Sequence, residues 1–141
     1  MTDTSKKTLF IMRAPSGSGK STWIKTHLPS AVVCSADSYF YRSGTYRFVP
    51  SHLPKAHAAC LASATAAMAE GHATVVIDNT NIRREWYRKY VELARDYGYE
   101  VFQVCLTTRF QNVHGVPDDK VQQMHDTFEQ DDTIPKWELS Q

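Results

Sequence analysis

Near its start the chain carries a glycine-rich stretch that ends in a lysine and a serine, APSGSGKS over residues 14–21. Its two glycines let the backbone curl until successive N–H groups point at phosphate oxygens. In this pattern the Lys20 ammonium reaches the β- and γ-phosphates of a nucleotide, and the Ser21 hydroxyl coordinates Mg²⁺. Ala14 replaces the first glycine of the usual pattern with another small residue. The residues predicted to bind phosphate are Ser16, Gly17, Ser18, Gly19, Lys20, Ser21 and Thr22.

Two aspartates follow apolar runs that have the length of buried strands. Asp78 ends the run TVVID over Thr74–Asp78, and Asp37 comes shortly after the run Ala31–Ser35. Open α/β sheets bind ligands at the carboxyl ends of their strands, so both carboxylates are expected near the phosphate loop. Asp78 can then hold a Mg²⁺-bound water, and Asp37 can accept the proton of an attacking hydroxyl. Each aspartate also has a plainer interpretation, as a turn or cap residue.

The elements that must position these residues alternate along the chain. The predicted strands are Thr8–Arg13, Ala31–Ser35, Thr74–Asp78 and Glu100–Leu106. The predicted helices are Lys20–His27, Pro54–Glu70, Arg83–Tyr97 and Asp118–Gln130. This alternation predicts an α/β fold with a parallel sheet and helices on both faces. Residues 38–51 are expected to be irregular, and Asp131 and Asp132 are expected to begin a solvated, loose tail.

Length and composition limit the class of protein. With 141 residues and 42% hydrophobic side chains, the chain can bury a core as a single domain, with the core at about 8–130 and a tail at 131–141. A net charge of +1 excludes a protein that coats nucleic acid through overall basicity. The absence of a long apolar run and of a signal peptide predicts a cytoplasmic protein without a membrane partner. The three cysteines lack zinc-site spacing and fit reduced thiols.

Size also favours one reaction among those that use such a loop. A GTPase or a motor needs a nucleotide-sensing switch, for which 141 residues leave little room. A small kinase needs a loop for the nucleotide, a base for the acceptor hydroxyl and a cationic lid over the transferred phosphoryl group. The motifs therefore favour phosphoryl transfer to an alcohol.

Aromatic and basic residues offer contacts for a nucleic acid. The aromatic run Tyr39–Phe48 is interleaved with Arg42 and Arg47, so it can stack exposed bases and contact phosphates. The same rings can instead fold onto the edge of the sheet. Arg83 and Arg84 can track a phosphate backbone or form part of a solvated helix face. The sequence leaves both pairs of interpretations open.

The motifs APSGSGKSTW, SADSYF, VIDNTN and NVHGVP, in this order, resemble the polynucleotide-kinase group of P-loop phosphotransferases. That group includes phage 5′-hydroxyl polynucleotide kinases and kinase-like domains of larger animal proteins. The resemblance covers about residues 8–130. GSGKST is common to P-loop proteins, whereas the other motifs in this order are far more specific.

The resemblance implies an adenylate-kinase-like parallel sheet and an ATP-dependent kinase that acts on a nucleic acid, with a polynucleotide 5′-hydroxyl as the leading acceptor. It implies that Lys20 and Ser21 hold ATP and Mg²⁺, that Asp37 is the general base, and that Asp78 with Asn81 organises the acceptor side. The residues predicted to bind the acceptor are Asp37, Tyr39, Arg42, Asp78, Asn81, Arg83 and Arg84.

The predicted lid departs from the family pattern. The segment from 109 to 116 corresponds to the lid, but the arginine that usually precedes the lid asparagine is replaced by Gln111. Arg109 is therefore predicted to supply the catalytic charge of the lid, beside Lys20 and Asp37. The alternatives are an arginine after the third strand or an arginine from a partner.

A second departure concerns the acceptor. The phage enzymes carry an arginine three residues after the base, where this chain has Phe40. This difference keeps open a kinase of a hydroxymethylated base, as in phage DNA modification, or of a small nucleoside-like alcohol. The thin lid keeps open a non-catalytic ATP-binding module. The sequence does not choose between DNA and RNA, and it does not fix the oligomeric state.

Overall fold

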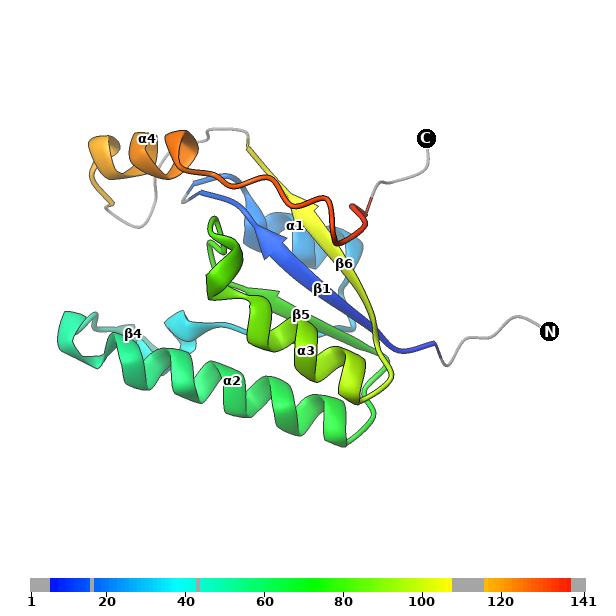
Figure 1. The fold of residues 1–141 in the computed structure, drawn as a ribbon. Helices are drawn as coiled ribbons and strands as arrows, with labels where there is room; N and C mark the ends of the chain where they lie inside the picture. Colours follow the sequence, from blue (N-terminus) through cyan, green and yellow to red (C-terminus); the bar gives the residue numbers. More distant parts are fainter. Residues whose placement is uncertain (1–5, 16, 43, 108–115, 138–141) are drawn as a thin grey trace.

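The computed structural model describes residues 6–15, 17–42, 44–107 and 116–137. These residues include a four-stranded parallel sheet in the order β2-β5-β1-β6 (Figure 1). Its strands are β1 (Thr8–Arg13), β2 (Val32–Cys34), β5 (Thr74–Asp78) and β6 (Glu100–Cys105). Neighbouring strands pair in parallel, and helices connect them. The predicted α/β class is therefore confirmed.

Helices cover both faces of the sheet (Figure 1). The main helices are α1 (Lys20–His27), α2 (Leu53–Ala69), α3 (Arg88–Asp96) and α4 (Asp118–Asp126). Residues of α1 belong to the apolar cluster on one face, and residues of α2 and α3 belong to the cluster on the other. Within the described ranges, no helix combines the length and the apolar character that a membrane crossing requires.

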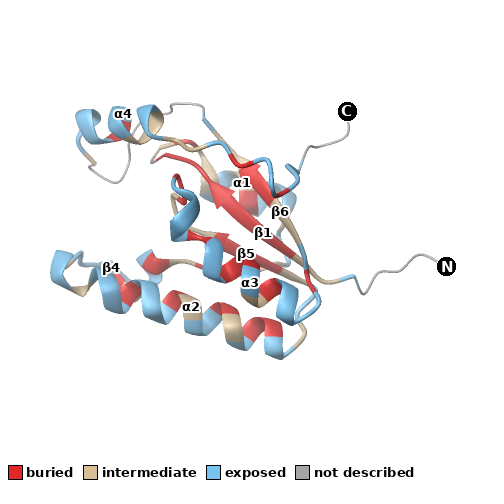
Figure 2. Ribbon diagram, viewed as in Figure 1, coloured by how far each residue is buried: buried red, intermediate tan, exposed pale blue. Residues whose placement is uncertain are grey.

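Alternate side chains of β1 face the two apolar clusters because this strand lies inside the sheet. Leu9 and Ile11 pack in the cluster of α2 and α3, whereas Phe10 and Met12 pack in the cluster of α1. All four are at most 4% exposed, so both faces of the strand are covered. Figure 2 shows buried residues along the strands and on the inner sides of the helices. The buried positions of α2 are mostly alanines, which permit a close approach to the sheet.

The register of the sheet brings two loops to one edge. Met12 of β1 lies opposite Asp78 of β5, so both strands end at the same level. The backbone N–H of Ala14, just after β1, donates to the carbonyl oxygen of Thr80, just after β5, at 2.8 Å. The glycine-rich loop and the loop that follows Asp78 are therefore joined directly at the carboxyl edge of the sheet.

The segment expected to be irregular contains regular structure. A 3₁₀ helix, η1 (Ala36–Phe40), leads into a two-stranded hairpin of β3 (Tyr41–Arg42) and β4 (Thr45–Tyr46). The hairpin turn contains Gly44 with φ of 79°, a left-handed conformation that glycine adopts without strain. A hydrophobic pattern could not predict this hairpin because each of its strands is only two residues long.

The helix predicted over Arg83–Tyr97 is shorter in the structure. A 3₁₀ turn, η3 (Arg84–Trp86), comes first, and α3 begins only at Arg88. Tyr87, between them, is 1% exposed and belongs to the core. A buried core residue therefore lies at the junction of the two helical segments.

The loose tail predicted from Asp131 onward is wrong for its described part, residues 131–137, although Asp132 is exposed as predicted. This segment pairs with the free edge of β6: the N–H of Gln103 donates to the carbonyl oxygen of Pro135, and the N–H of Trp137 donates to that of Gln103, each at 2.9 Å. The Trp137 ring stacks edge-on against aromatic rings of β1 and β6. Asp131 itself is 4% exposed. The segment is therefore an edge cover of the sheet.

We expect Gly98→Ala to lower the free energy of unfolding by about 1–2 kcal/mol. Gly98 follows α3 with φ of 78°, and an added Cβ would meet nothing within 4 Å, so the cost is conformational rather than steric. Urea unfolding followed by circular dichroism measures it. Gly98→Asn should lower the free energy of unfolding by less than Gly98→Ala, because asparagine tolerates this conformation better than alanine does. Equal stability of wild type and Gly98→Ala would contradict the left-handed assignment.

Candidate active site

The glycine-rich loop has the backbone geometry that its sequence predicts. It lies between β1 and α1, and Gly17 and Gly19 have φ of 81° and 84°. Gly19 caps the N-terminus of α1 without a side-chain hydrogen bond. The first N–H groups of α1 therefore keep their capacity to bind an anion, and the helix dipole favours a negative charge there.

The hydroxyl groups of the loop fit a phosphate-bearing ligand. Ser18 is 4% exposed, and its Oγ has no hydrogen-bond partner among the described residues. A buried hydroxyl without a partner costs free energy unless a ligand completes it. Ser21 and Thr22, in the first turn of α1, are exposed and open to a ligand from outside.

The Lys20 ammonium lies near two of the predicted site carboxylates. Burial lowers the pKa of its ammonium below the usual value of 10.5, while the negative charges of Asp78 and Asp37 act to raise it. Both carboxylates therefore lie within electrostatic reach of the Lys20 ammonium. The structure thus brings together the phosphate loop after β1, the end of β5 and the turn after β2, as the sequence predicts for a parallel sheet.

Asp37 lies in η1, with its side chain exposed at the edge of the sheet. Its backbone N–H donates to Oγ of Ser35, which caps the turn, at 3.2 Å. The Tyr46 hydroxyl of β4 donates to Oδ1 of Asp37 at 3.4 Å. This contact ties the hairpin to the carboxylate that is predicted to act as the base.

Asn79 is a positioning residue that the sequence analysis did not identify. Its Oδ1 accepts a hydrogen bond from the N–H of Ala36 at 2.9 Å, and its Nδ2 donates to the Cys60 sulfur at 3.6 Å. Asn79 therefore connects the loop after β5 both to the turn that carries Asp37 and to α2. Its position inside the VIDNTN motif was the only available signal.

The buried side chain of Asn81 connects the loop after β5 to the end of β1. It is 3% exposed, its φ is 46°, and its Nδ2 donates to the carbonyl oxygen of Met12 at 2.9 Å. The described contact of this side chain is with the backbone of β1, and the predicted contact of Asn81 with an acceptor stays a prediction.

Arg13 is the second positioning residue that sequence analysis missed. It ends β1 directly before the loop and is 0% exposed. Its guanidinium donates to the carbonyl oxygens of Asn81 at 2.8 Å, Ile82 at 3.0 Å and Glu129 at 2.6 Å, and to Oε1 of Gln103 at 3.0 Å. Arg13 thus links the loop after β5, strand β6 and the C-terminal segment. In the sequence, the only sign of this role was that Arg13 is the single charged residue of the otherwise apolar run TLFIMR.

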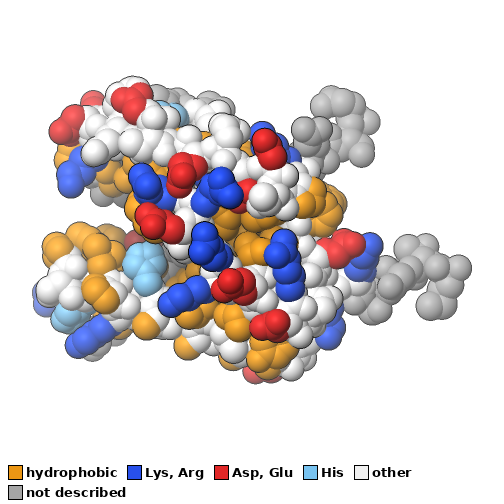
Figure 3. All heavy atoms as spheres, viewed as in Figure 1, with side chains coloured by type: hydrophobic (Ala, Val, Ile, Leu, Met, Phe, Trp, Pro, Cys, Tyr) orange, Lys and Arg blue, Asp and Glu red, His pale blue; other side chains and the backbone are white. Residues whose placement is uncertain are grey.

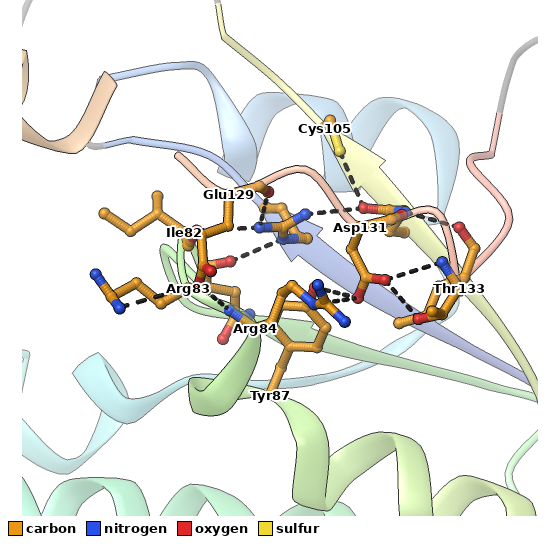
Figure 4. A network of polar contacts seen from close by, with 12 residues as sticks. Ile82, Arg83, Arg84, Tyr87, Cys105, Glu129, Asp131 and Thr133 are labelled. Carbon is orange, nitrogen blue, oxygen red and sulfur yellow. Dashed lines mark hydrogen bonds and ion pairs between the residues drawn. The ribbon is translucent and has the colours of Figure 1, made fainter. Parts of the chain in front are cut away.

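The same network anchors the C-terminal segment (Figure 4). The Tyr87 hydroxyl donates to Oδ2 of Asp131 at 2.6 Å. Burial acts to raise the pKa of Asp131, but hydrogen bonds from Thr133 and Tyr87, with the nearby charge of Arg84, bring its pKa below the usual value. Asp131 is therefore a buried, ionised anchor.

Arg83 and Arg84 lie at the surface next to carboxylates. Arg83 Nε is 3.3 Å from Oε1 of Glu85, and the backbone N–H of Arg84 donates to Oε1 of Glu129 at 2.9 Å. With Arg88, these residues line a hollow of about 320 Å³. An acceptor phosphate at this hollow would meet arginines whose charge is partly balanced already, so their predicted binding role stays a prediction.

Several predicted residues have other outcomes. Arg109 and Ser16 lie outside the described residues, and so does the side chain of Arg42. Tyr39 is half-buried and packs against the core cluster of α2 and α3, while Phe40 is 4% exposed and belongs to that cluster. The aromatic run therefore divides into rings that pack on the sheet and rings that stay exposed.

The residues at this edge suit Mg²⁺ through oxygen ligands. Within the described part of the chain, no group of three or more His, Cys, Asp or Glu residues could hold a metal ion by itself. Mg²⁺ commonly takes one or two protein oxygens and completes its shell with nucleotide phosphates and water. Ser21 and Asp78 would supply those protein oxygens. The bound ion would neutralise charge on the phosphates.

The parallel sheet, the strand–loop–helix unit and the lysine at their junction define a P-loop protein with a kinase-like fold. A family model described as an AAA domain (AAA_33) matches residues 9–116, and the chain belongs to this family.

Comparisons with known proteins agree with the fold. NEDD4-binding protein 2 from Homo sapiens is 31% identical over 140 residues, which cover 90% of this chain and 8% of that protein. This chain thus corresponds to a small part of that relative. A structure of AvrRxo1-ORF1:-ORF2 with ATP has a TM-score of 0.63 at 14% identity, over 87% of this chain and 47% of that one. The APS kinase CysC of Mycobacterium tuberculosis has a TM-score of 0.52 at 17% identity, over 86% and 96%.

Proposed function

We propose that this protein is an ATP-dependent kinase that transfers the γ-phosphate to a hydroxyl on a nucleic acid, with a polynucleotide 5′-hydroxyl as the acceptor. The observation that carries the proposal is the environment of Lys20. Its ammonium lies within electrostatic reach of Asp78 and of the exposed Asp37. The glycine-rich loop and an accessible carboxylate then lie at the same edge of the sheet, which suits transfer from a nucleotide to an alcohol.

The residues have distinct tasks in this reaction. The loop and the N-terminus of α1 hold the ATP phosphates, and Lys20 balances their charge. The acceptor oxygen attacks the γ-phosphorus, its proton passes to Asp37, and the bond to the bridging oxygen breaks as ADP leaves. Asn79 holds the turn that carries Asp37 in place through Ala36.

The nucleic-acid acceptor is supported by the order of the motifs, which resembles that of polynucleotide kinases and of kinase-like domains in larger animal proteins. The match to NEDD4-binding protein 2 from Homo sapiens, of which this chain covers 8%, is consistent with the second group. The test is γ-labelled ATP with a panel of acceptors: 5′-hydroxyl DNA, 5′-hydroxyl RNA, closed duplex with hydroxymethylated bases, and free nucleosides. Label on the 5′ ends supports the proposal. ATP binding without label on any acceptor would reject catalysis and favour a binding module.

One observation favours a second candidate, a kinase of a hydroxymethylated base or of a small nucleoside-like alcohol. Phe40 stands where the phage enzymes carry an arginine for the nucleic-acid phosphate, and it is buried in the core at 4% exposed. This position therefore cannot supply a phosphate contact. Label on closed, hydroxymethylated duplex or on nucleosides, but not on ordinary 5′ ends, would establish this candidate.

We expect the affinity for ATP to fall as the pH rises, and to begin falling at a lower pH than it would with a lysine of ordinary pKa. Burial lowers the pKa of Lys20, and only its protonated form balances the phosphates. Above that lowered pKa, binding of ATP must take up a proton, so the affinity falls by about tenfold per pH unit. Titration calorimetry between about pH 7 and pH 10 measures the effect.

The matched control is Lys20→Arg, because a guanidinium keeps its charge throughout this range. Whatever the ATP affinity of this variant at neutral pH, that affinity should not fall further as the pH rises. An equally steep fall in both proteins would assign the effect to another group.

A further inference from the structure

A cavity of about 480 Å³ lies beside the predicted base and has no part in the mechanism described above. It is formed by η1, the hairpin and the 3₁₀ turn η2 (Pro50–His52). The residues that line it are Tyr39, Phe40, Thr45, Arg47, Val49 and His52. Its volume is in the range of pockets that hold small organic ligands.

The walls of this cavity are aromatic and carry one permanent cation. The Tyr39 ring packs edge-to-face against His52, with centroids 5.9 Å apart, and against Phe40, with centroids 5.2 Å apart. Phe40 is buried in the core, so this group of rings is fixed to the body of the protein. Arg47 is exposed, and its backbone N–H donates to the carbonyl oxygen of Phe40 at 2.8 Å.

The cavity and the predicted base belong to one small structural unit. Tyr39 follows Asp37 in the same 3₁₀ helix, and the Tyr46 hydroxyl of the hairpin donates to Asp37 Oδ1. Asp37 does not line the cavity itself, but the 3₁₀ helix and the hairpin that form the cavity walls also hold Asp37. In Figure 3 hydrophobic side chains gather at the hairpin end of the molecule.

The chemistry of these walls selects a flat, π-rich group attached to an anion. Aromatic side chains hold nucleobases by stacking and edge contacts, which tolerate any base because every base has a π face. A guanidinium adds contact with a phosphate or with the base itself. A sugar or an alcohol without a base would lack this π stacking with the rings.

We propose that this cavity binds the first nucleobase of the acceptor strand, the base attached to the sugar whose 5′-hydroxyl is phosphorylated, and that Arg47 contacts the phosphate that follows it. This inference rests on the proposed function and deepens it. It assigns acceptor recognition to the hairpin rather than to an arginine at position 40, and it makes a base at the end a requirement.

The experiment compares two 5′-hydroxyl oligonucleotides that differ only at their first residue, one with a base and one abasic. For the wild type we expect kcat/KM to be about 10- to 100-fold lower on the abasic end. Tyr39→Leu should lose a similar factor on the normal end and then treat the two ends alike. The difference between ends reports the cavity itself, because a general disturbance of Asp37 would lower the rate on both ends equally.

The matched control is Tyr41→Leu, which removes an exposed ring of the same hairpin that does not line the cavity. It should keep the wild-type preference for the end with a base. Arg47→Gln should raise KM on both ends and keep the preference, because it removes a phosphate contact and leaves the rings.

The outcomes separate this inference from the function on which it rests. Equal activity of the wild type on both ends would overturn the base pocket and leave the kinase proposal intact. If no end accepts phosphate, the kinase proposal fails, and binding of an oligonucleotide with a fluorescent 2-aminopurine at its 5′ end decides the inference. A fluorescence change that Tyr39→Leu abolishes and Tyr41→Leu keeps would support the pocket. No change in the wild type would overturn it.

Discussion

Asp37→Asn should lower kcat for phosphoryl transfer by about 10²- to 10⁴-fold while ATP binds as tightly as before or more tightly. Asparagine has the same shape, so it can still accept the hydrogen bond from Tyr46, but it cannot take the proton of the acceptor hydroxyl. ATP affinity should not fall, because the change removes a negative charge near the phosphates. Initial rates with γ-labelled ATP and titration calorimetry measure the two quantities separately.

The matched control for this prediction is Asp96→Asn. Asp96 is an exposed carboxylate at the end of α3, away from the residues assigned to the site. It should leave both the rate and the ATP affinity unchanged. If Asp37→Asn retained the wild-type rate, another group would have to be the base, and the shared edge of Asp37 and Lys20 would need a different explanation.

The parts of the fold that follow from local patterns could be predicted from the sequence. The bounds of β1, α1 and β5 agree with those expected from the runs TLFIMR, KSTWIKTH and TVVID. The apolar runs predict β1 and β5, whereas α1 follows from the glycine-rich loop before it and Pro29 after it. Parallel pairing then brings Lys20 and the two aspartates to one edge, because the chemistry-bearing residues follow strands that end at the same level.

The parts that depend on distant partners could not be predicted. Arg13 is buried because Gln103 and Glu129, which lie 90 and 116 residues away, supply oxygen atoms for its guanidinium. The segment from Asp131 to Trp137 looks polar in sequence, and it packs because the edge of β6 offers backbone partners. The aromatic run was ambiguous for the same reason: only the position of α2 decides which rings are buried.

Arg13→Met should lower the free energy of unfolding by about 3–5 kcal/mol. Since folded domains are stable by only about 5–15 kcal/mol, this is a large part of the total. Methionine fills a similar volume and carries no charge that must be buried, and both properties favour the stability of the variant. It donates no hydrogen bonds, however, so the carbonyl oxygens of Asn81 and Glu129 and Oε1 of Gln103 lose the Arg13 donor inside the protein.

We expect the lost hydrogen bonds to cost more free energy than is gained by no longer burying a charge. The variant also loses the contact of the guanidinium with two aromatic rings, whose centroids lie 4.8 Å away (Tyr87) and 4.6 Å away (Phe128). Urea unfolding measures the change. Arg95→Met, at an exposed position of α3, should cost little. Should Arg13→Met fail to fold, Arg13→Lys keeps the charge, loses the planar set of donors, and should be destabilised to a smaller extent.

A local measurement distinguishes a specific anchor from general destabilisation. The N–H of Trp137 donates to the carbonyl oxygen of Gln103, so its hydrogen exchange reports whether the C-terminal segment stays on β6. In Arg13→Lys this amide should exchange faster relative to amides of β1 and β5, because Arg13 joins β6 to Glu129 just before that segment. Uniform acceleration across the sheet would mean that Arg13 contributes only to global stability. Faster exchange confined to the segment would show that the arginine beside the phosphate loop also holds the edge of the sheet in place.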